Sequence, residues 1–287
     1  MPTQPVIEID HLLTYVRDLD SAAALFRRLG FTLSPISRIE TMGISNHLVL
    51  MHPGTSGAGN YIELMAAHDR ARLPAVMART LAGAEGIKSM VLSAADAHAA
   101  QAAFVAQGFA VDPPAHVKRE WPIGPGQSVF PEFDVLLPVD APLVFNCCRY
   151  FNLELYLRPD WLEHANSARC LRSVLAVAAD PQRIAAIFAG VFGRPAAGTA
   201  DIAHVSPGAV DLVLMTPAAL RERYGLDVSA PEQGAHYVGY VIEVASLERL
   251  TACLAQGHVE QRSLGASVCV GPDGGLGNLI VFEAGSS

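Results

Sequence analysis

The sequence has few lysines and no long run of either basic or hydrophobic residues. Lys88 and Lys118 are the only lysines among 20 basic residues, which are outnumbered by 28 acidic residues and leave a net charge of −8. This balance argues against nucleic acid and against an anionic membrane surface as the main partner. The longest apolar run, near 184–193, has about ten residues, half of what a membrane-spanning helix needs.

The sequence also lacks a CxxC motif and a leader-like N-terminus. Its five cysteines are an odd number, and two of them, Cys147 and Cys148, are adjacent. This pattern argues against a zinc finger or a disulfide scaffold. The first ten residues contain neither a basic region nor an apolar stretch of the kind found in secretory signals. We therefore expect reduced cysteines and a cytoplasmic protein.

The composition is that of a globular protein with a large core. Hydrophobic residues make up 51% of the 287 residues and charged residues 17%. This composition excludes a disordered chain, and the length allows one large or two ordinary domains.

A weak internal repeat runs through the whole sequence. Its four copies lie near 9–33, 87–111, 172–195 and 237–259. Each copy has an apolar strand, an Asp or Ser that can cap a helix, an Ala/Leu-rich helix and a glycine that precedes another strand. In the first copy, Asp18 and Asp20 precede the helix and Gly30 ends it.

Two or three short strands follow each predicted helix. In the first copy we expect them at about 31–36, 47–51 and 60–65, separated by glycine and proline turns. The predicted unit is therefore β-α-β-β-β, present four times. The segment 149–168 fits neither a strand nor a helix of the repeat, so we interpret it as a linker between two halves.

Several short motifs point to a known family. The first module opens with Ile-Asp-His at 9–11 and closes with Gly-Asn-Tyr-Ile-Glu-Leu at 59–64, and Asn46-His47 lies between them. A Trp…His-x-Asn segment, with Trp161, His164 and Asn166, follows the second module. In these features the sequence resembles the vicinal oxygen chelate superfamily, which includes glyoxalases, bleomycin-resistance proteins and extradiol dioxygenases, and most closely its glyoxalase-like-domain group.

The resemblance implies an α+β fold of the glyoxalase / bleomycin resistance / dihydroxybiphenyl dioxygenase type. Four β-α-β-β-β modules would form two halves, an N-terminal domain at 5–155 and a degenerate C-terminal domain at 165–285. The first half would form a cup-shaped sheet with its helices outside.

The alternation of residues along strands gives three candidate functional side chains, because alternate residues share a face. On each of the three strands, aliphatic residues occupy the face opposite His11, His47 or Glu63, among them Leu12, Leu48, Leu50 and Leu64. If those aliphatic residues pack under the helix, all three polar side chains point to the other face of the sheet. The plainer alternative is that each is an ordinary hydrogen-bonded residue.

The resemblance implies that this other face is concave and that His11 and Glu63 occupy the family's metal-ligand positions. An imidazole and a carboxylate suit Zn, Mn, Fe, Co or Ni, and the sequence does not choose among these ions or exclude the absence of any metal. The second module lacks the matching pair, because Ser89 and about Asn146 stand in those positions. Only half of the family's metal site is therefore present.

The C-terminal half lacks the ligands altogether. Ser173 and Gly239 stand at the histidine positions of the third and fourth modules, and Val281 stands at a carboxylate position. We expect no metal there, and this half could be only a structural or homodimer-forming part.

His47 is the predicted catalytic residue. It could complete the site as a third ligand, or it could transfer a proton near the substrate, since histidine titrates near neutral pH. The expected substrate-binding residues are Tyr15, Tyr61, Asn146, Arg149, Trp161, His164 and Asn166. Arg149 and His164 are expected at the mouth of the cup, where the guanidinium could hold a substrate carboxylate. The alternative is that the linker residues only attach the linker to the sheet.

The leading functional prediction is a metal-dependent enzyme that acts on a small oxygen-rich molecule. In the family that the sequence resembles, the metal chelates two neighbouring substrate oxygens, and lyase, isomerase and dioxygenase reactions all use this chemistry. The rival prediction is a small-molecule-binding protein without catalysis, of the bleomycin-resistance type.

Overall fold

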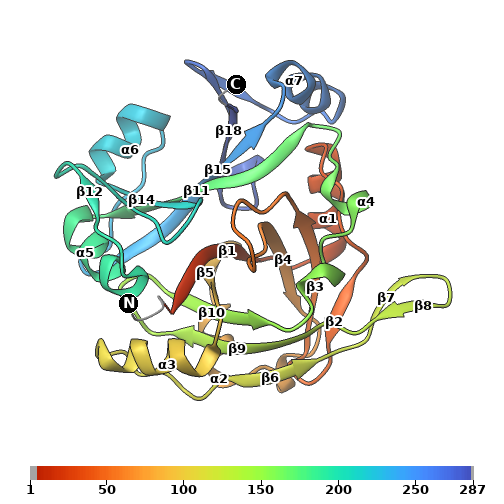
Figure 1. Cartoon of the computed structure of the whole chain (residues 1–287). Coiled ribbons are helices and arrows are strands. Elements are labelled where there is room, and N and C mark those ends of the chain that lie inside the picture. The colour runs from red at the N-terminus through yellow and green to blue at the C-terminus, as the bar shows by residue number, and fades with distance from the viewer. Residues whose placement is uncertain (1–4, 286–287) are drawn as a thin grey trace.

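The structure is a computed structural model that describes residues 5–285. The expectation about a leader-like N-terminus falls partly on residues 1–4, which lie outside the described residues. Figure 1 shows two strongly curved sheets, one from each half of the chain. The first sheet has the strand order β2-β3-β4-β1-β5-β10-β9-β6, and the second has the order β12-β13-β14-β11-β15-β18-β17-β16.

The first sheet is built from two modules. The first comprises β1 (Val6–Tyr15), α1 (Leu19–Arg28), β2 (Ser37–Ile39), β3 (Ile44–Leu50) and β4 (Tyr61–Ala67). The second comprises β5 (Gly86–Ala94), α3 (Ala97–Ala106), β6 (Ala115–Lys118), β9 (Glu132–Val139) and β10 (Phe145–Tyr150). Within each module the first and last strands pair in parallel, and β1 pairs antiparallel to β5 at the centre of the sheet.

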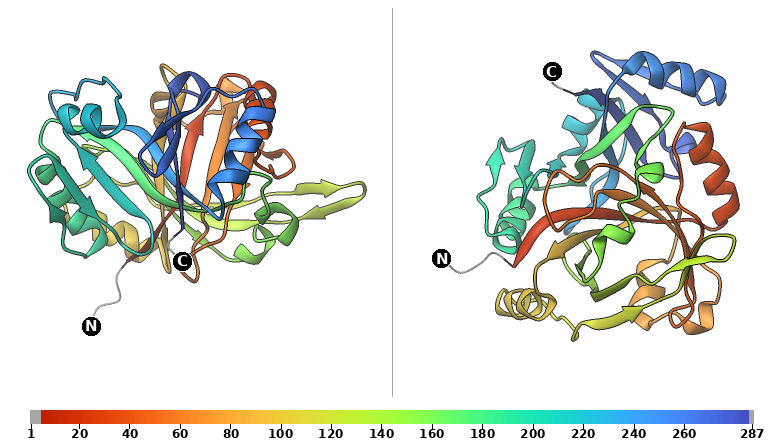
Figure 2. Two further views of the ribbon diagram at one scale, coloured as in Figure 1. Left: turned by 90° about the horizontal axis from the view of Figure 1, so that it is seen from above. Right: turned by 45° about the vertical axis from the view of Figure 1, so that its right-hand side comes forward.

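Three short additions decorate the first half. A 3-10 helix (Arg70–Arg72) and α2 (Ala75–Thr80) join the modules. The hairpin formed by β7 (Trp121–Gly124) and β8 (Gln127–Val129) projects from the body of the molecule (Figure 2).

The linker and the second half repeat the same plan. The linker contains a 3-10 helix (Leu153–Leu155) and α4 (Pro159–Leu162). The third module comprises β11 (Ala168–Ala178), α5 (Pro181–Phe192), β12 (Ala197–Gly198), β13 (Ile202–Val205) and β14 (Asp211–Met215), and α6 (Pro217–Tyr224) follows it. The fourth comprises β15 (Ala235–Val244), α7 (Leu247–Gln256), β16 (Arg262–Leu264), β17 (Ser267–Val270), a 3-10 turn (Pro272–Gly274) and β18 (Leu279–Ala284). The predicted α+β architecture of four modules in two halves is thus confirmed.

The predicted helix caps explain why each helix starts where it does. The side chains of Asp18, Asp96, Asp180 and Ser246 each accept a hydrogen bond from the backbone N–H three residues later, at 2.6–3.1 Å. Each such cap typically contributes about 1 kcal/mol. A side-chain helix cap therefore recurs in all four modules, as the repeat predicts.

One predicted strand is wrong. The segment 31–36 is not a strand, and β2 starts only at Ser37. Pro35 lacks a backbone N–H and cannot donate to a ladder, and within residues 5–285 the bond from Ser34 N to Leu48 O at 2.9 Å is the one backbone–backbone hydrogen bond between this segment and β3.

The two halves share one hydrophobic core between the convex faces of their sheets. Phe26, Phe104, Phe188 and Phe282, which come from all four modules, are fully buried in this single cluster. Figure 1 shows α1 beside α7 on one flank and α3 beside α5 on the other. Because the convex faces are used for this contact, the concave face of each sheet is turned away from the other half.

Among residues 5–285, none of the helices is long and apolar enough to cross a membrane. The five cysteines carry free thiols, as expected from their number and spacing.

Candidate functional site

A cavity occupies the concave face of the first sheet. Its volume is about 70 Å³, and side chains from β1, β3, β4, β5, β9 and β10 line it. Most of the wall is apolar and includes Leu13, Ile44, Met65, Val91, Phe133 and Val135. The polar groups in this wall are few, so each of them has a strong influence on what the cavity binds.

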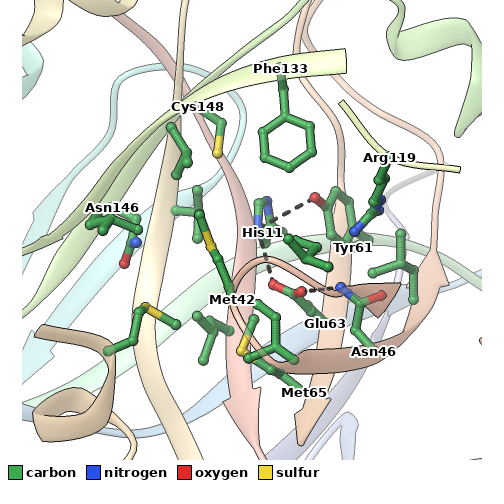
Figure 3. Close-up of a pocket in the computed structure, with 18 of the residues that line it drawn as sticks. His11, Met42, Asn46, Tyr61, Glu63, Met65, Arg119, Phe133, Asn146 and Cys148 are labelled. Atoms are coloured by element: carbon green, nitrogen blue, oxygen red, sulfur yellow. Dashed lines mark hydrogen bonds and ion pairs between the residues drawn. The ribbon is translucent and has the colours of Figure 1, made fainter. Parts of the chain in front are cut away.

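His11 projects from β1 into this cavity (Figure 3). Asp10 holds its imidazole in place. The register of β1 against β5 shifts between Ile9 and His11, which is typical of a β-bulge. The carboxylate of Asp10 lies 2.7 Å from His11 Nδ1 and also accepts hydrogen bonds from the hydroxyl of Tyr150, at 2.8 Å, and from the backbone N–H of Gly59. Asp10 therefore fixes the proton of neutral His11 on Nδ1, so that Nε2 faces the cavity.

Glu63 lies beside His11 as the sequence predicts. The parallel register places Glu63 opposite Leu13, two residues along β1 from His11. Glu63 Oε2 is 3.7 Å from His11 Nε2, and Oε1 accepts a hydrogen bond of 2.5 Å from Asn46 Nδ2 on β3. His11 and Glu63 thus line one cavity, as the sequence predicts.

The environment of His11 favours its protonated form. Burial alone would lower its pKa, but the hydrogen bonds and charges of Asp10 and Glu63 outweigh burial and raise the pKa of His11 above its usual value. The charges of Asp10 and Glu63 therefore stabilise a positive charge on the imidazole of His11.

Two tyrosines complete this polar group. The ring of Tyr61 stacks on His11 with ring centres 4.1 Å apart, and its hydroxyl lies 2.9 Å from that of Tyr150. Burial and the nearby charge of Asp10 raise the pKa of both phenols well above the ordinary value. Both hydroxyls are therefore protonated at neutral pH and act as hydrogen-bond donors.

The second module supplies a neutral pair at the equivalent positions. Asn146 pairs in register with Val91 as Glu63 does with Leu13, and its Oδ1 accepts a hydrogen bond of 2.5 Å from Ser89 Oγ. Asn146 lines the cavity, as expected. The two modules thus place a charged pair and an uncharged pair on the same concave face.

His47 does not lie in the cavity, and its predicted placement is wrong. Its Nδ1 donates to the backbone carbonyl of Ser34 at 2.7 Å, and burial together with the charge of Arg27 on α1 lowers its pKa. Asn46 and Leu48 line the cavity instead. Leucine at 48 does not have to pack under the helix, because the concave face is itself apolar and buries Leu48 in a cluster with Trp121.

Arg149 also faces away from the cavity. Asn146 and Cys148 on β10 line it, and the residue between Cys148 and Tyr150 must point to the opposite face. There Arg149 stacks on Phe151 at 3.7 Å and lies near Asp134 in an outer groove. The predicted position of Arg149 at the mouth of the cup is therefore wrong.

The linker residues hold the linker to the sheet. His164 Nε2 donates to the carbonyl of Leu50 at 2.8 Å and Nδ1 accepts from the N–H of Thr32 at 3.0 Å. Asn166 Nδ2 donates to the carbonyl of Leu29 at 2.9 Å. The alternative structural interpretation of these residues is the correct one, and His164 is not at the mouth of the cavity.

Two other predicted residues lie beside the cavity rather than in its wall. Trp161 packs on Trp121, with ring centres 4.9 Å apart, in the cluster that contains Leu48. Tyr15 belongs to the apolar cluster around Leu13, where its hydroxyl accepts a hydrogen bond of 2.6 Å from Arg70.

Sequence reasoning missed Asp10, Asn46 and Arg119 as site residues. Asp10 precedes His11 directly, but simple alternation assigns it to the opposite face, and only the bulge in β1 brings both into one group. Arg119 lies between β6 and β7, where no sequence periodicity applies.

The corresponding concave face of the second half is filled. Val213 and Val281 occupy the registers that correspond to Glu63, and both are buried. They belong to an apolar cluster to which α6 contributes Leu220 and Tyr224. Apolar side chains therefore take the place of the polar group that β1 and β4 form in the first half.

The residues of the first cavity fit part of a divalent-metal site. Two donors about 2.1 Å from one ion are roughly 3.0–3.6 Å apart at bond angles of 90–120°. The 3.7 Å between His11 Nε2 and Glu63 Oε2 needs only a small closure. Asp10 and Asn46 orient the two donors as outer partners of metal ligands do. Among residues 5–285 no group of three His, Cys, Asp or Glu side chains could hold an ion, so the remaining ligands would be water or substrate oxygens.

Comparisons with known proteins agree with this architecture. Residues 9–192 match the family model described as a glyoxalase-like domain, a match that extends through the linker into α5. No curated protein matches. A hypothetical protein from Staphylococcus aureus is 11% identical with a TM-score of 0.65, and the match covers 96% of this chain and 98% of that one.

Two enzymes from Streptomyces coelicolor are also similar in structure. A mutant of 4-hydroxymandelate synthase is 11% identical with a TM-score of 0.56, and the match covers 99% of this chain and 95% of that one. Methylmalonyl-CoA epimerase is 20% identical over 50% of this chain and 94% of its own, with a TM-score of 0.37. At 11% identity, the matches to the hypothetical protein and to the synthase show likeness of fold alone. Because the family model covers well over half of the sequence, the chain belongs to the glyoxalase-like domain family of the vicinal oxygen chelate superfamily.

Proposed function

We propose that this protein is an enzyme that converts a small oxygen-bearing molecule at His11 and Glu63, with a divalent metal ion bound by these two residues. The observation that carries the proposal is the row Asp10–His11–Glu63–Asn46 at the wall of a largely apolar cavity, joined by hydrogen bonds at its two ends and by the 3.7 Å contact between His11 and Glu63. Burying several charged groups is costly, and an arrangement of this kind is typical of functional sites.

Each of the four side chains has a distinct task in the proposed site. Asp10 keeps the proton of the imidazole on Nδ1 and so leaves Nε2 of His11 free to bind a metal ion or to accept a proton. Asn46 occupies one oxygen of Glu63 and directs the other toward His11. The bound ion would act as a Lewis acid on substrate oxygens.

The tyrosines and the apolar wall support the same role. The phenol of Tyr61, which is protonated at neutral pH, lies 3.4 Å from His11 Nε2 and could redirect its hydrogen bond from the hydroxyl of Tyr150 to a substrate oxygen. The wall excludes most water, and this strengthens the electrostatic interactions inside the cavity. Its small volume favours a small substrate, or the small reacting end of a larger one.

Metal binding tests the proposal directly. The protein is stripped with a chelator, dialysed separately against Zn, Mn, Fe, Co and Ni, and analysed for bound metal. We expect one bound ion in the wild type and its loss in His11→Ala and in Glu63→Gln. Asp10→Asn keeps both ligands but loses an outer partner, so its affinity is expected to fall about 10- to 100-fold.

The surface of the protein provides a matched control. His116 lies 2.8 Å from Asp134 and 3.5 Å from Glu132, an arrangement close to that of His11, but its side chain is 54% exposed. His116→Ala should leave the metal content unchanged. A wild type that binds no ion, or an ion that His116→Ala removes and His11→Ala does not, would contradict the proposal.

The second candidate function is small-molecule binding without chemistry. It is favoured by the pair Ser89 and Asn146, whose hydrogen bond to each other replaces the second set of metal ligands. A protein that binds small ligands in the cavity, with neither metal nor turnover in the wild type, would establish this alternative.

A further inference from the structure

Arg119 is a buried cation without an anionic partner. Only 8% of the residue is exposed, and the side chain reaches the cavity from the segment between β6 and β7. Figure 3 shows the guanidinium pointing into the cavity, on the side where Tyr61 lies. Among residues 5–285 Arg119 forms no ion pair within 4.0 Å of a carboxylate, and its buried Nε has no hydrogen-bond partner.

The contacts that Arg119 does make satisfy little of its hydrogen-bonding capacity. One Nη atom lies 3.4 Å from the hydroxyl of Tyr156, a long and weak bond. The guanidinium lies 5.6 Å from the ring of Trp121 and 5.7 Å from that of Phe133. A guanidinium has five N–H donors and stays charged, and within residues 5–285 the long bond to Tyr156 is its one side-chain hydrogen bond, while Nε is buried and unpaired.

An unpaired buried charge is costly, and a ligand that pairs with it recovers that cost. We propose that Arg119 binds the carboxylate of a small organic acid in this cavity. A carboxylate matches the planar fork of the guanidinium with two parallel hydrogen bonds, which is the strongest pairing available to arginine. The proposal rests on the proposed function for the place where the ligand reacts, but it does not depend on metal binding.

Asn46 narrows the class of ligand. Its Nδ2 donates to the carboxylate of Glu63, so the other amide atom must be the acceptor Oδ1, which is buried and has no partner within residues 5–285. The largely apolar wall thus contains two residues with an unpaired polar atom, the donor Nε of Arg119 and the acceptor Oδ1 of Asn46, both of them buried. A hydroxy acid with a short apolar body supplies the matching carboxylate, hydroxyl and hydrocarbon groups.

The position of Arg119 also indicates how the ligand enters. A larger cleft of about 560 Å³ lies outside the cavity, and Ile39 and Arg119 line both spaces. The outer cleft also contains Arg38 and Lys118, together with Glu40 and Glu120. Arg119 therefore stands where the cleft meets the cavity, and an acid held there would direct its other end toward His11.

Binding of simple acids tests this inference. The probes are 2-hydroxybutyrate and benzoate, each compared with its neutral amide, and inorganic phosphate, and affinities are measured by calorimetry or NMR titration with the full chain. We expect the wild type to bind each acid more tightly than its amide. Arg119→Met, which keeps the length of the side chain and removes the charge, should lower acid affinity about 10- to 100-fold and leave amide affinity unchanged.

Two further variants separate charge, geometry and nonspecific effects. Arg119→Lys should recover only part of the acid affinity, because an ammonium group lacks the fork. Arg158→Met is the matched control, because Arg158 also lies over a tryptophan ring, at 5.3 Å from Trp161, but outside the cavity wall. Its acid affinity should equal that of the wild type. Equal affinity of wild type and Arg119→Met for the acids would overturn the proposal.

The remaining outcomes distinguish this inference from the metal site. Arg119→Met should bind metal as the wild type does. Loss of acid binding with retained metal binding therefore supports carboxylate binding by Arg119, even if no turnover is found. If phosphate binds more tightly than both acids and Arg119→Met abolishes that binding, the ligand class is a phosphate and the carboxylate proposal is wrong. Near-UV circular dichroism of each variant checks that the fold is retained.

Discussion

His164 makes the attachment of the linker sensitive to acid. Both of its ring nitrogens are used, since Nε2 donates to Leu50 O and Nδ1 accepts from Thr32 N. Nδ1 can accept only while the imidazole is neutral, and the residue is just 4% exposed. Burial is the main reason why the pKa of His164 falls from 6.5 to about 4, although the hydrogen bond to Leu50 opposes the shift. Protonation must break the bond to Thr32.

The size and sign of the effect follow from this pKa. In the unfolded chain His164 takes up its proton near pH 6.5, whereas in the folded protein it does so only near pH 4. Between these values the unfolded state binds more protons, so the free energy of unfolding falls as the pH falls. A shift of that size corresponds to about 3 kcal/mol, present in full above pH 6.5 and lost by pH 4.

Urea unfolding of the wild type and of His164→Gln measures this loss. Glutamine can donate and accept a hydrogen bond but does not titrate. Between pH 7.5 and pH 4, we expect the stability of the wild type relative to the variant to fall by about 3 kcal/mol. His98→Gln, at an exposed position, should show no such change relative to the wild type. If the difference between wild type and His164→Gln is the same at every pH, our account of His164 is wrong.

Three further predictions concern other buried polar groups. Asp10→Asn should lower the pKa of His11, as measured by NMR titration of the imidazole. In the wild type, protonation of His11 stabilises the folded protein, and this stabilisation should be lost as the pH rises through the raised pKa. Glu8→Ala should destabilise the protein by roughly 3 kcal/mol in urea unfolding, because the buried carboxylate accepts the backbone N–H of Ala209, at 2.6 Å, and so links the two halves. His47→Ala should leave metal content and ligand affinity unchanged in the assays described above, because this side chain faces α1; a loss of either would contradict that placement.

Much of the fold could be predicted from the sequence because each module repeats the same local signals. In each module a side chain at the start of the helix accepts a hydrogen bond, a glycine follows the helix, and apolar strands lie on either side. Asp18 and Gly30 are these two residues in the first module. These signals act within a few residues and so survive in a weak repeat. His11 and Glu63 could be placed because β1 beyond its bulge and β4 alternate regularly.

The error over His47 has a physical origin. Alternation along a strand shows which residues share a face. It also shows which face is buried, but only when the other face is exposed to solvent. Here one face of β3 packs against α1 and the second half, while the other packs into the apolar cup, and all seven residues of β3 are buried. Leu48 and Val49 are therefore both buried, on opposite faces of β3. The sequence alone does not show which of these faces is turned toward the helix.

Buried polar residues in this protein differ in how completely their hydrogen bonds are satisfied, but this difference alone does not separate structural residues from candidate functional ones. Asn166 uses both ends of its amide, with Leu29 and Ala168 as partners, and so needs nothing further. Arg119 and Asn46 each keep an unused atom at a cavity wall. Within residues 5–285 the hydroxyl of Tyr240 also has no partner, but it lies in the core between the halves, where no ligand can reach it. An unsatisfied polar group therefore indicates binding only where it also faces a cavity, and that combination depends on contacts between distant segments, which sequence periodicity does not report.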